Sequence, residues 1–485
     1  MNTFLNELKE QENYGITENG AIKHNSTLNA VLDMFALGGA FRNRSADECI
    51  DLFGKAFDED PELALKCLFY IGDCRGGQGE RRFFRVCFRW LANFYPEVAK
   101  RNLPYIPEYR RFDDILYACI NTPIENDALN IIKEQLAKDV QSETPSLLGK
   151  WLPSANTSSS ITKAMANKVR EYLGMTHRQY RKTLSILRSR INVLEKLMSE
   201  GRWGEIDFGG IPSKAGINYR NAFATREETK DRYKAFLDSK DVKVNASVLT
   251  PVDVVHKAMD HRRDHEMIER KALDQYWKDL PDYYGDTVEN GLAVVDVSGS
   301  MWGLPMEAAI GLGAYIAERG HGPFANHFIT FSQYPELVKF HGADIVEKVN
   351  NCQNANWGYN TNIEAVFDLL LRTAKSKNTK PEDMPTRLYI LSDMEFDYGL
   401  SLKNGENIDT LLESIAKVWR TEGYELPQVV FWNLSARSNN IPAIGGRFSY
   451  ISGFSPVMIP QILGHVSAEE IMKSKLLSDR YSPIH

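Results

Sequence analysis

Four short, almost entirely apolar segments in the second half of the chain constrain the fold most. They read GLAVVDVS, FANHFITFS, TRLYILSD and PQVVFWNLS, and they are rich in β-branched and aromatic residues. Between them lie longer stretches whose apolar residues recur three and four positions apart, which is the period of a helix. Strands that are apolar on both faces need helices on both sides. The alternation therefore predicts a doubly wound α/β sheet with parallel strands over residues 291–485.

The chain before this region has the period of helices throughout. From about residue 26 to 278, segments such as STLNAVLDMFALGG and ERRFFRVCFRWLANFY are amphipathic, and short glycine or proline breaks separate them. Successive antiparallel helices predict an all-helical repeat domain, an α-solenoid, without a fixed sequence period. The polar segment 279–290 is the predicted linker, and residues 1–25 form a separate N-terminal segment. The expected fold class is α + α/β.

Composition is that of a globular protein with more than one core. The chain has 485 residues, of which 43% are hydrophobic and 25% charged. No basic start with an apolar run and no apolar stretch of membrane-spanning length occurs in the sequence, so we expect a cytoplasmic protein without a membrane partner. The six cysteines form no CxxC pair. Neither a disulfide framework nor a zinc site is therefore expected.

Hydroxyl and carboxylate side chains follow three of the predicted elements. Asp296, Ser298 and Ser300 come where the first strand ends, Thr361 precedes a helix, and Asp393 ends the third predicted strand. Because the carboxyl ends of parallel strands meet at one edge of a sheet, these side chains are expected to lie close together. Hydroxyl and carboxylate oxygens suit a hard cation such as Mg²⁺ or Mn²⁺. The five residues are therefore the predicted ligands of one divalent metal ion.

Each of these residues also has a structural explanation. The two serines can cap the helix that follows them, Thr361 can cap the next one, and Asp393 can be a turn residue. The DxSxS motif alone does not separate the two explanations, because short motifs recur by chance. The later elements, each at a strand end or helix start in the expected order, favour the metal.

The five residues, with the alternating strands around them, resemble the metal-ion-dependent adhesion site of von Willebrand factor A domains. The resemblance implies hydroxyl oxygens on the ion, carboxylates bound directly or through water, and one coordination position open to a carboxylate of a partner. It does not imply an enzyme. The sequence also lacks a serine nucleophile elbow and a catalytic cysteine pattern, so no catalytic residue is expected.

A second resemblance, to the family catalogued as domain of unknown function 2828, covers most of the chain. It is carried by LLGKWLPSANTSSSITKAMANKVREYLGMTHRQYRKTLSILRSRINVLEKLM, VFWNLSA and YISGFS. More distantly, a helical repeat of TROVE or HEAT type followed by an A domain is similar to the Ro autoantigen and other TROVE proteins. IGDCRGGQGERRFFR resembles the glycine and arginine segment of that class. The distant resemblance implies a small noncoding RNA as ligand.

Basic residues are concentrated in one region, although the net charge is −6. Residues 151–250 hold 18 Lys or Arg against 10 Asp or Glu. Helical spacing groups Arg178, Arg181 and Lys182 beside Tyr180, and cations with an aromatic ring suit RNA. The alternative is a solvated helix face whose side-chain stems cover apolar surface.

The loop CRGGQGERR is a second candidate for RNA phosphates, since glycine amides before a helix can bind an anion. The alternative is a tight turn whose arginines pair with acids such as Asp113 and Asp114. The full set of candidate RNA-binding residues is Arg75, Arg81, Arg82, Lys163, Lys168, Arg170, Arg178, Arg181, Lys182, Arg188 and Arg190.

Three functions are consistent with these features. The first is a noncatalytic RNA-binding protein, with the helices as RNA platform and the A domain as a metal-supported partner site. The second is an interaction adaptor without RNA, whose metal receives an acidic residue of a protein partner, for example an AAA-type ATPase. The third, a metal-dependent hydrolase, lacks a general base that the sequence can name.

Overall fold

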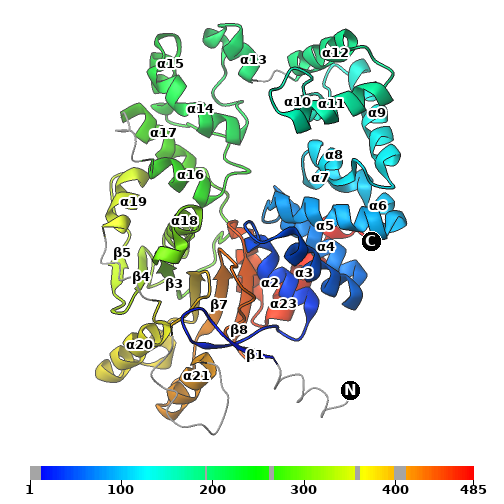
Figure 1. The fold of residues 1–485 in the computed structure, drawn as a ribbon. Helices are drawn as coiled ribbons and strands as arrows, with labels where there is room; N and C mark the ends of the chain where they lie inside the picture. Colours follow the sequence, from blue (N-terminus) through cyan, green and yellow to red (C-terminus); the bar gives the residue numbers. More distant parts are fainter. Residues whose placement is uncertain (1–12, 192–193, 261–266, 355–360, 398–410) are drawn as a thin grey trace. The chain divides into compact units, whose positions relative to one another are not determined.

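Six strands form one mixed sheet in the C-terminal part of the chain (Figure 1). In spatial order they run β5-β4-β3-β6-β7-β8, and every neighbouring pair is parallel except β4 with β5. The four predicted strands are confirmed as β3, β4, β6 and β7, whereas β5 and β8 were not predicted. The strands are β3 Gly291–Asp296, β4 His327–Phe331, β5 Leu337–Lys339, β6 Arg387–Ser392, β7 Gln428–Asn433 and β8 Phe448–Ser452.

The strand order reverses between β3 and β6. From β3 the chain forms β4 on one side, and it later forms β6 on the other side of β3. In open parallel sheets such a reversal separates the two following loops and leaves a binding crevice at the carboxyl ends. Val295 of β3 pairs with Leu391 of β6, so Asp296 and Ser392 follow side by side at this edge.

The computed structural model describes the chain except at five segments, and the chain divides into two compact units. The sheet unit comprises Met1–Cys67 and Ala246–Ser478, and the helical unit comprises Leu68–Asn245 and Asp479–His485. The described residues are 13–191, 194–260, 267–354, 361–397 and 411–485.

Helices with small residues cover the sheet. α18, Leu304–Arg319, packs on β3, and Gly313 leaves no room for a Cβ atom against Val295. α16, Pro251–Ala258, packs on α18 in turn, with Gly311 of α18 against its backbone. The remaining helices after residue 246 are α17 Met267–Lys278, α19 Ile345–Gln353, α20 Ile363–Lys377, α21 Leu411–Thr421, α22 Ile459–Gly464 and α23 Ala468–Leu476.

The first part of the chain also packs on the sheet. α2, Ala30–Leu37, lies against β8, and the backbone N–H of Gly39 donates to Ser452 Oγ at 2.9 Å. An antiparallel hairpin, β1 Tyr14–Ile16 and β2 Ile22–His24, precedes α2. Isolated β-bridges join this hairpin to Asp397 and Ile441. α2 is followed by α3 Ala46–Glu59 and α4 Pro61–Gly72.

These contacts divide the chain differently from the boundaries expected at residues 25, 278 and 290. Residues 246–278 and the described residues before 68 group with the sheet, because α2 and α16 bury apolar faces against β8 and α18. Whether the expected boundaries mark parts that fold alone stays a prediction.

The helical unit confirms the helical character of the region before the sheet. Its core near the start is aromatic, with Phe69 edge-on to Phe84 and Tyr109. Its helices are α5 Arg81–Phe94, α6 Pro96–Asn102, α7 Ile106–Tyr109, α8 Asp113–Cys119, α9 Glu125–Gln141, α10 Leu148–Trp151, α11 Ser160–Tyr172, α12 His177–Arg190, α13 Leu194–Ser199, α14 Ser213–Thr225 and α15 Glu227–Leu237. None of the helices in the described part of the chain has both the length and the apolar character needed to cross a membrane.

Candidate metal centre and basic surface

Asp296 ends β3 and is completely buried. Its Oδ1 accepts a hydrogen bond from the backbone N–H of Ser298 at 2.8 Å. Its Oδ2 accepts one from the Ser392 hydroxyl at 2.6 Å. Because β3 and β6 end side by side, the loop after β3 and the last residue of β6 hold this carboxylate from both sides.

The two serines lie in the loop after β3 and do not cap α18. Ser298 is buried and Ser300 is exposed, and their hydroxyl oxygens are 3.0 Å apart. The N-cap of α18 is Gly303, without a side-chain hydrogen bond. The N-cap of α20 is Asn362, not Thr361. Ser298 stands at the N-cap of the short 3-10 helix Gly299–Met301 without a side-chain bond. None of the three hydroxyl groups therefore makes a side-chain capping bond to these helices.

The side chains of Asp393 and Thr361 both form hydrogen bonds with the backbone of Glu395, which lies after β6. Asp393 Oδ1 accepts from the backbone N–H of Glu395 at 3.1 Å, and the Thr361 hydroxyl donates to the carbonyl of the same Glu395 at 2.9 Å. Asp393 Oδ2 is buried and accepts no hydrogen bond from the described residues. It lies 3.1 Å from Nη2 of Arg437, which is an ion pair.

Negative charge at this edge is poorly compensated. Burial, together with the neighbouring charge of Asp393, raises the pKa of Asp296 to about 7. Burial also raises the pKa of Asp393, although a hydrogen bond from Ser300 and the charge of Arg437 oppose this. The two carboxylates therefore lie close enough to repel each other.

The donor set fits a hard divalent cation. It consists of two carboxylates and three hydroxyl groups, all of them oxygen ligands, and one buried carboxylate oxygen is without a hydrogen bond. Across the described ranges, no three or more His, Cys, Asp or Glu side chains are grouped so that they could hold a metal ion. A centre at this edge thus depends on its hydroxyl groups as much as on its acids.

Sequence reasoning missed several neighbours of these residues. Asn19, in the turn of the N-terminal hairpin, donates from Nδ2 to the Glu395 carbonyl at 2.7 Å and to the Thr361 hydroxyl at 3.3 Å. Glu18 and Arg437 form an ion pair beside it. Local sequence patterns cannot reveal contacts between residues so far apart in the chain. Ser392 could have been predicted, because it directly precedes Asp393 at the end of a strand.

The comparisons with known proteins place the chain in a family. Residues 17–111 and 114–283 match the family model described as "Domain of unknown function (DUF2828)". The chain belongs to the DUF2828 family. Residues 290–480 match a second model, "Domain of unknown function (DUF7788)".

Two proteins are similar to this DUF2828 member over most of its length. "Uncharacterized protein L728" of Acanthamoeba polyphaga mimivirus is 31% identical over 510 residues, covering 96% of this chain and 86% of that protein. The crystal structure of the Deinococcus radiodurans Ro (RSR) protein aligns with a TM-score of 0.48 and 13% identity, covering 93% of this chain and 99% of that one.

Several of the candidate RNA-binding arginines of this DUF2828 protein have structural partners. Arg188 donates to the Gly149 and Leu152 carbonyls and to the Ser154 hydroxyl at 2.9–3.0 Å, so it ties α12 to the end of α10. Arg190 donates to the Val140 carbonyl at 2.7 Å. All three nitrogen atoms of the Arg188 guanidinium are engaged, whereas Arg190 uses only Nη1 and its side chain is exposed.

Tyr180 is also part of the core. Its side chain is only 1% exposed, and its hydroxyl donates to the Pro153 carbonyl at 2.9 Å. A buried ring cannot stack on a base, so the expectation of a cationic face with an aromatic platform is corrected here. The aromatic residue of α12 faces inward because it continues the apolar stripe of Leu184 and Leu187.

The other candidates fall into two groups. Lys168 pairs with Glu125, Arg170 with Glu171, and Arg75 donates to the Glu108 carbonyl. The candidates with exposed side chains are Arg75, Arg82, Lys163, Arg178, Arg181, Lys182 and Arg190.

The loop CRGGQGERR is a tight turn with internal partners. The N–H of Gln78 donates to the Tyr70 carbonyl, and that of Gly79 to the Asp73 carbonyl. A Cβ atom on Gly77 would collide with the Tyr70 carbonyl. Arg81 contacts both Asp113 and Asp114 at 3.4 Å, as the structural alternative predicted.

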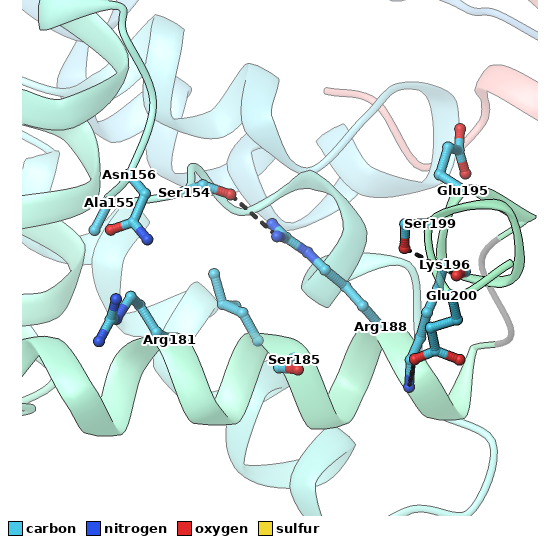
Figure 2. A pocket seen from close by; sticks show the side chains of 11 residues that line it. Ser154, Ala155, Asn156, Arg181, Ser185, Arg188, Glu195, Lys196, Ser199 and Glu200 are labelled. Carbon is cyan, nitrogen blue, oxygen red and sulfur yellow. Dashed lines mark hydrogen bonds and ion pairs between the residues drawn. The ribbon is translucent and has the colours of Figure 1, made fainter.

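A groove of about 520 Å³ runs along α12 (Figure 2). Arg181 and Asn156 lie toward one end, and the carboxylates of Glu195 and Glu200 toward the other. Arg188, on its floor, is held by Ser154. The mixed charge of this lining favours no purely anionic ligand over its whole length.

Proposed function

We propose that this protein is a noncatalytic binding protein that uses a divalent cation, Mg²⁺ or Mn²⁺, to bind a carboxylate of a protein partner. The proposed ligands are Asp296, Ser298, Ser300, Thr361 and Asp393. The observation that carries the proposal is the pair of buried, mutually repelling carboxylates at the reversal point of the sheet. One oxygen of this pair accepts no hydrogen bond from the described residues.

The surrounding bonds support such a role by keeping the ligands in place. The Ser298 N–H and the Ser392 hydroxyl fix both oxygens of Asp296, and the Glu395 N–H fixes one oxygen of Asp393. The cation supplies positive charge and a coordination position for an external carboxylate. Ser300 is exposed, so the proposed site is open to solvent on that side.

The noncatalytic part of the proposal rests on two acids beside the ligands. Asp397 accepts from the Thr361 N–H at 2.8 Å and from the Thr361 hydroxyl at 3.3 Å. Glu395 is only 1% exposed. Its Oε2 accepts from the backbone N–H of Glu18 at 2.9 Å and its Oε1 from the Ser438 hydroxyl at 2.7 Å. A general base needs a free oxygen within reach of the reacting proton, and both oxygens of Glu395 are occupied.

Metal titration of the whole chain tests the proposal. We expect Mn²⁺ to bind with a stoichiometry of about one, measured by calorimetry and by electron paramagnetic resonance of the free ion, since one pair of carboxylates provides one site. Asp296→Asn should lose this binding because it removes one of the two charged ligands. Asp286→Asn, which changes an exposed aspartate, is the matched control. Wild-type affinity in Asp296→Asn would contradict the site.

A second candidate function, binding of a small noncoding RNA, is favoured by one observation. Arg178, Arg181 and Lys182 are exposed along one helix, and cations at this spacing can follow a phosphate backbone. This function concerns the helical unit alone and is compatible with the first.

A further inference from the structure

Arg437 lies between two carboxylates of the sheet unit. Its Nη2 is 3.1 Å from Asp393 Oδ2, and its Nη1 is 2.7 Å from a carboxylate oxygen of Glu18. Asp393 is a proposed metal ligand, whereas Glu18 belongs to the turn between β1 and β2. The guanidinium therefore connects the proposed metal centre to a second acid of the same chain.

The backbone of the hairpin turn is fixed independently of this arginine. The Thr17 hydroxyl donates to the Phe396 carbonyl at 2.8 Å, and the Glu18 N–H donates to Glu395 Oε2 at 2.9 Å. The turn stays on the sheet edge even when the Glu18 side chain moves.

The side chains of the outer ion pair are accessible to solvent. The Glu18 side chain is 55% exposed and that of Arg437 is 36% exposed, whereas Asp393 is buried. Exposed ion pairs contribute little free energy and exchange readily. The Glu18 carboxylate can therefore leave Arg437 at low cost, while Asp393 keeps the guanidinium beside the proposed metal centre.

We infer that Arg437 is a second recognition group for the partner's carboxylate, and that Glu18 is a resident acid that occupies it until an acidic peptide segment takes its place. The inference rests on the proposed function. An incoming carboxylate has two oxygens, so one can face the cation and the other the guanidinium, whose planar donors match carboxylate geometry. Such a two-point contact selects a carboxylate over a neutral oxygen ligand.

The inference predicts opposite effects on metal and on peptide. Arg437 and a cation at Asp393 repel each other, so loss of the arginine strengthens metal binding while it removes a contact to the peptide. Loss of Glu18 removes the internal competitor, so peptide binding becomes tighter. An arginine with a merely structural role would weaken both metal and peptide binding when replaced.

The experiment uses the full chain, Mn²⁺ as the metal and a fluorescein-labelled hexa-aspartate peptide as the probe. Mn²⁺ affinity is measured by electron paramagnetic resonance, and peptide affinity by anisotropy at saturating Mn²⁺. We expect Glu18→Gln to raise peptide affinity about threefold, which corresponds to the free energy of an exposed ion pair. We expect Arg437→Gln to lower it about tenfold, as for a lost charge-assisted hydrogen bond, while Mn²⁺ affinity rises.

Two control variants carry the same charge changes elsewhere on the sheet unit. Glu422→Gln breaks the exposed pair with Lys375, and Arg372→Gln breaks the exposed pair with Asp368. Neither should change either affinity.

Each result decides between the inference and the proposed function. Unchanged peptide affinity in Glu18→Gln and Arg437→Gln, or a joint loss of metal and peptide binding in Arg437→Gln, overturns the inference. A wild-type chain that binds Mn²⁺ but not the peptide also overturns it and leaves the metal centre standing. A wild-type chain that binds no Mn²⁺ removes the proposed function, and the inference falls with it.

Discussion

Buried carboxylates occur in two opposite electrostatic settings in this protein. At the sheet edge, burial raises the pKa values of both Asp296 and Asp393, and the charge of Asp393 adds to the rise at Asp296. In the helical unit, burial also disfavours the charged form of Asp114, but Arg110, Arg85 and Arg81 outweigh it and hold the pKa below its ordinary value. In the second setting the arginines outweigh burial without a ligand, whereas in the first the single arginine beside Asp393, Arg437, does not. That contrast is why the sheet edge, and not the arginine cluster, is the candidate site.

Replacement of Asp114 tests the arginine cluster as a structural element. Arg110 is buried and donates to Asp114 Oδ2 at 3.1 Å, so Asp114→Asn leaves a buried guanidinium without its charge partner. We expect a loss of about 3–5 kcal/mol in the free energy of unfolding at pH 7, measured by urea denaturation. Arg82→Gln, at an exposed arginine nearby, should cost far less.

The ion pair between Arg110 and Asp114 also predicts how the free energy of unfolding changes with pH. A carboxyl whose pKa is lower in the folded state stabilises the fold above its unfolded pKa, about 4, and this contribution is lost as pH falls through the folded value. The stability of the wild-type chain should therefore fall below pH 4 more steeply than that of Asp114→Asn. Equal acid sensitivity of the two chains would show that Asp114 is not charged in the fold.

Residue patterns predicted the ligands of the candidate centre but not what surrounds them. Asp296, Ser298 and Asp393 were recognisable because each lies at the end of an apolar strand. Glu18, Asn19 and Arg437 were not, because their relation to the site depends on how a hairpin near the start of the chain docks on the sheet.

Among the elements, α12 shows how packing changes the interpretation of a basic helix. Tyr180 and Arg188 are used internally, which leaves the exposed cations Arg178, Arg181 and Lys182. Helical periodicity gave the spacing of all of them. Periodicity alone could not show which side chains of α12 hydrogen-bond the end of α10, because those bonds depend on how the two helices pack.

Charge reversal on α12 tests RNA binding. We expect Arg178→Glu, Arg181→Glu and Lys182→Glu together to lower the affinity for a small structured RNA. The slope of log affinity against log salt should fall by up to about 0.9 for each lost phosphate contact. Filter binding over a salt series measures both quantities.

The matched control for α12 reverses three other exposed lysines of the helical unit, Lys230, Lys234 and Lys240, with the same number of charges changed. If both triple variants lose affinity equally, net charge rather than this helix attracts RNA. If neither does, α12 is a solvated face, and the carboxylate-binding function stands alone.

The strands differ in how visible they were in the sequence. β3, β4, β6 and β7 are nearly continuous apolar runs because both faces are covered. β5 has three residues, exposed or half-buried, and pairs only at the edge of the sheet, so its sequence carries little signal. β8 contains two serines, one of which bonds the end of α2, and polar residues in a buried strand hide it from a search for apolar runs.

At the scale of the whole molecule, the sheet depends on helices from distant parts of the chain. A fragment of residues 286–478 lacks α2, which covers β8, and α16, which covers α18. We expect this fragment to aggregate under conditions in which the full chain stays dispersed, because apolar faces are left uncovered. A fragment of residues 246–478 regains α16 and should be more soluble, as measured by light scattering. Equal monodispersity of both fragments and the full chain would contradict this expectation and support the boundary at 279–290.

The contact between Gly39 and Ser452 spans 413 residues of sequence, and this separation has a consequence for synthesis. A ribosome that adds 5–20 residues per second delivers β8 on the order of 20–80 s after α2. During that interval α3 can pack on α2, but the face meant for β8 has no strand to cover it. Nascent chains of this protein are therefore expected to recruit a chaperone to α2, and the sheet can close only after β8 has been translated.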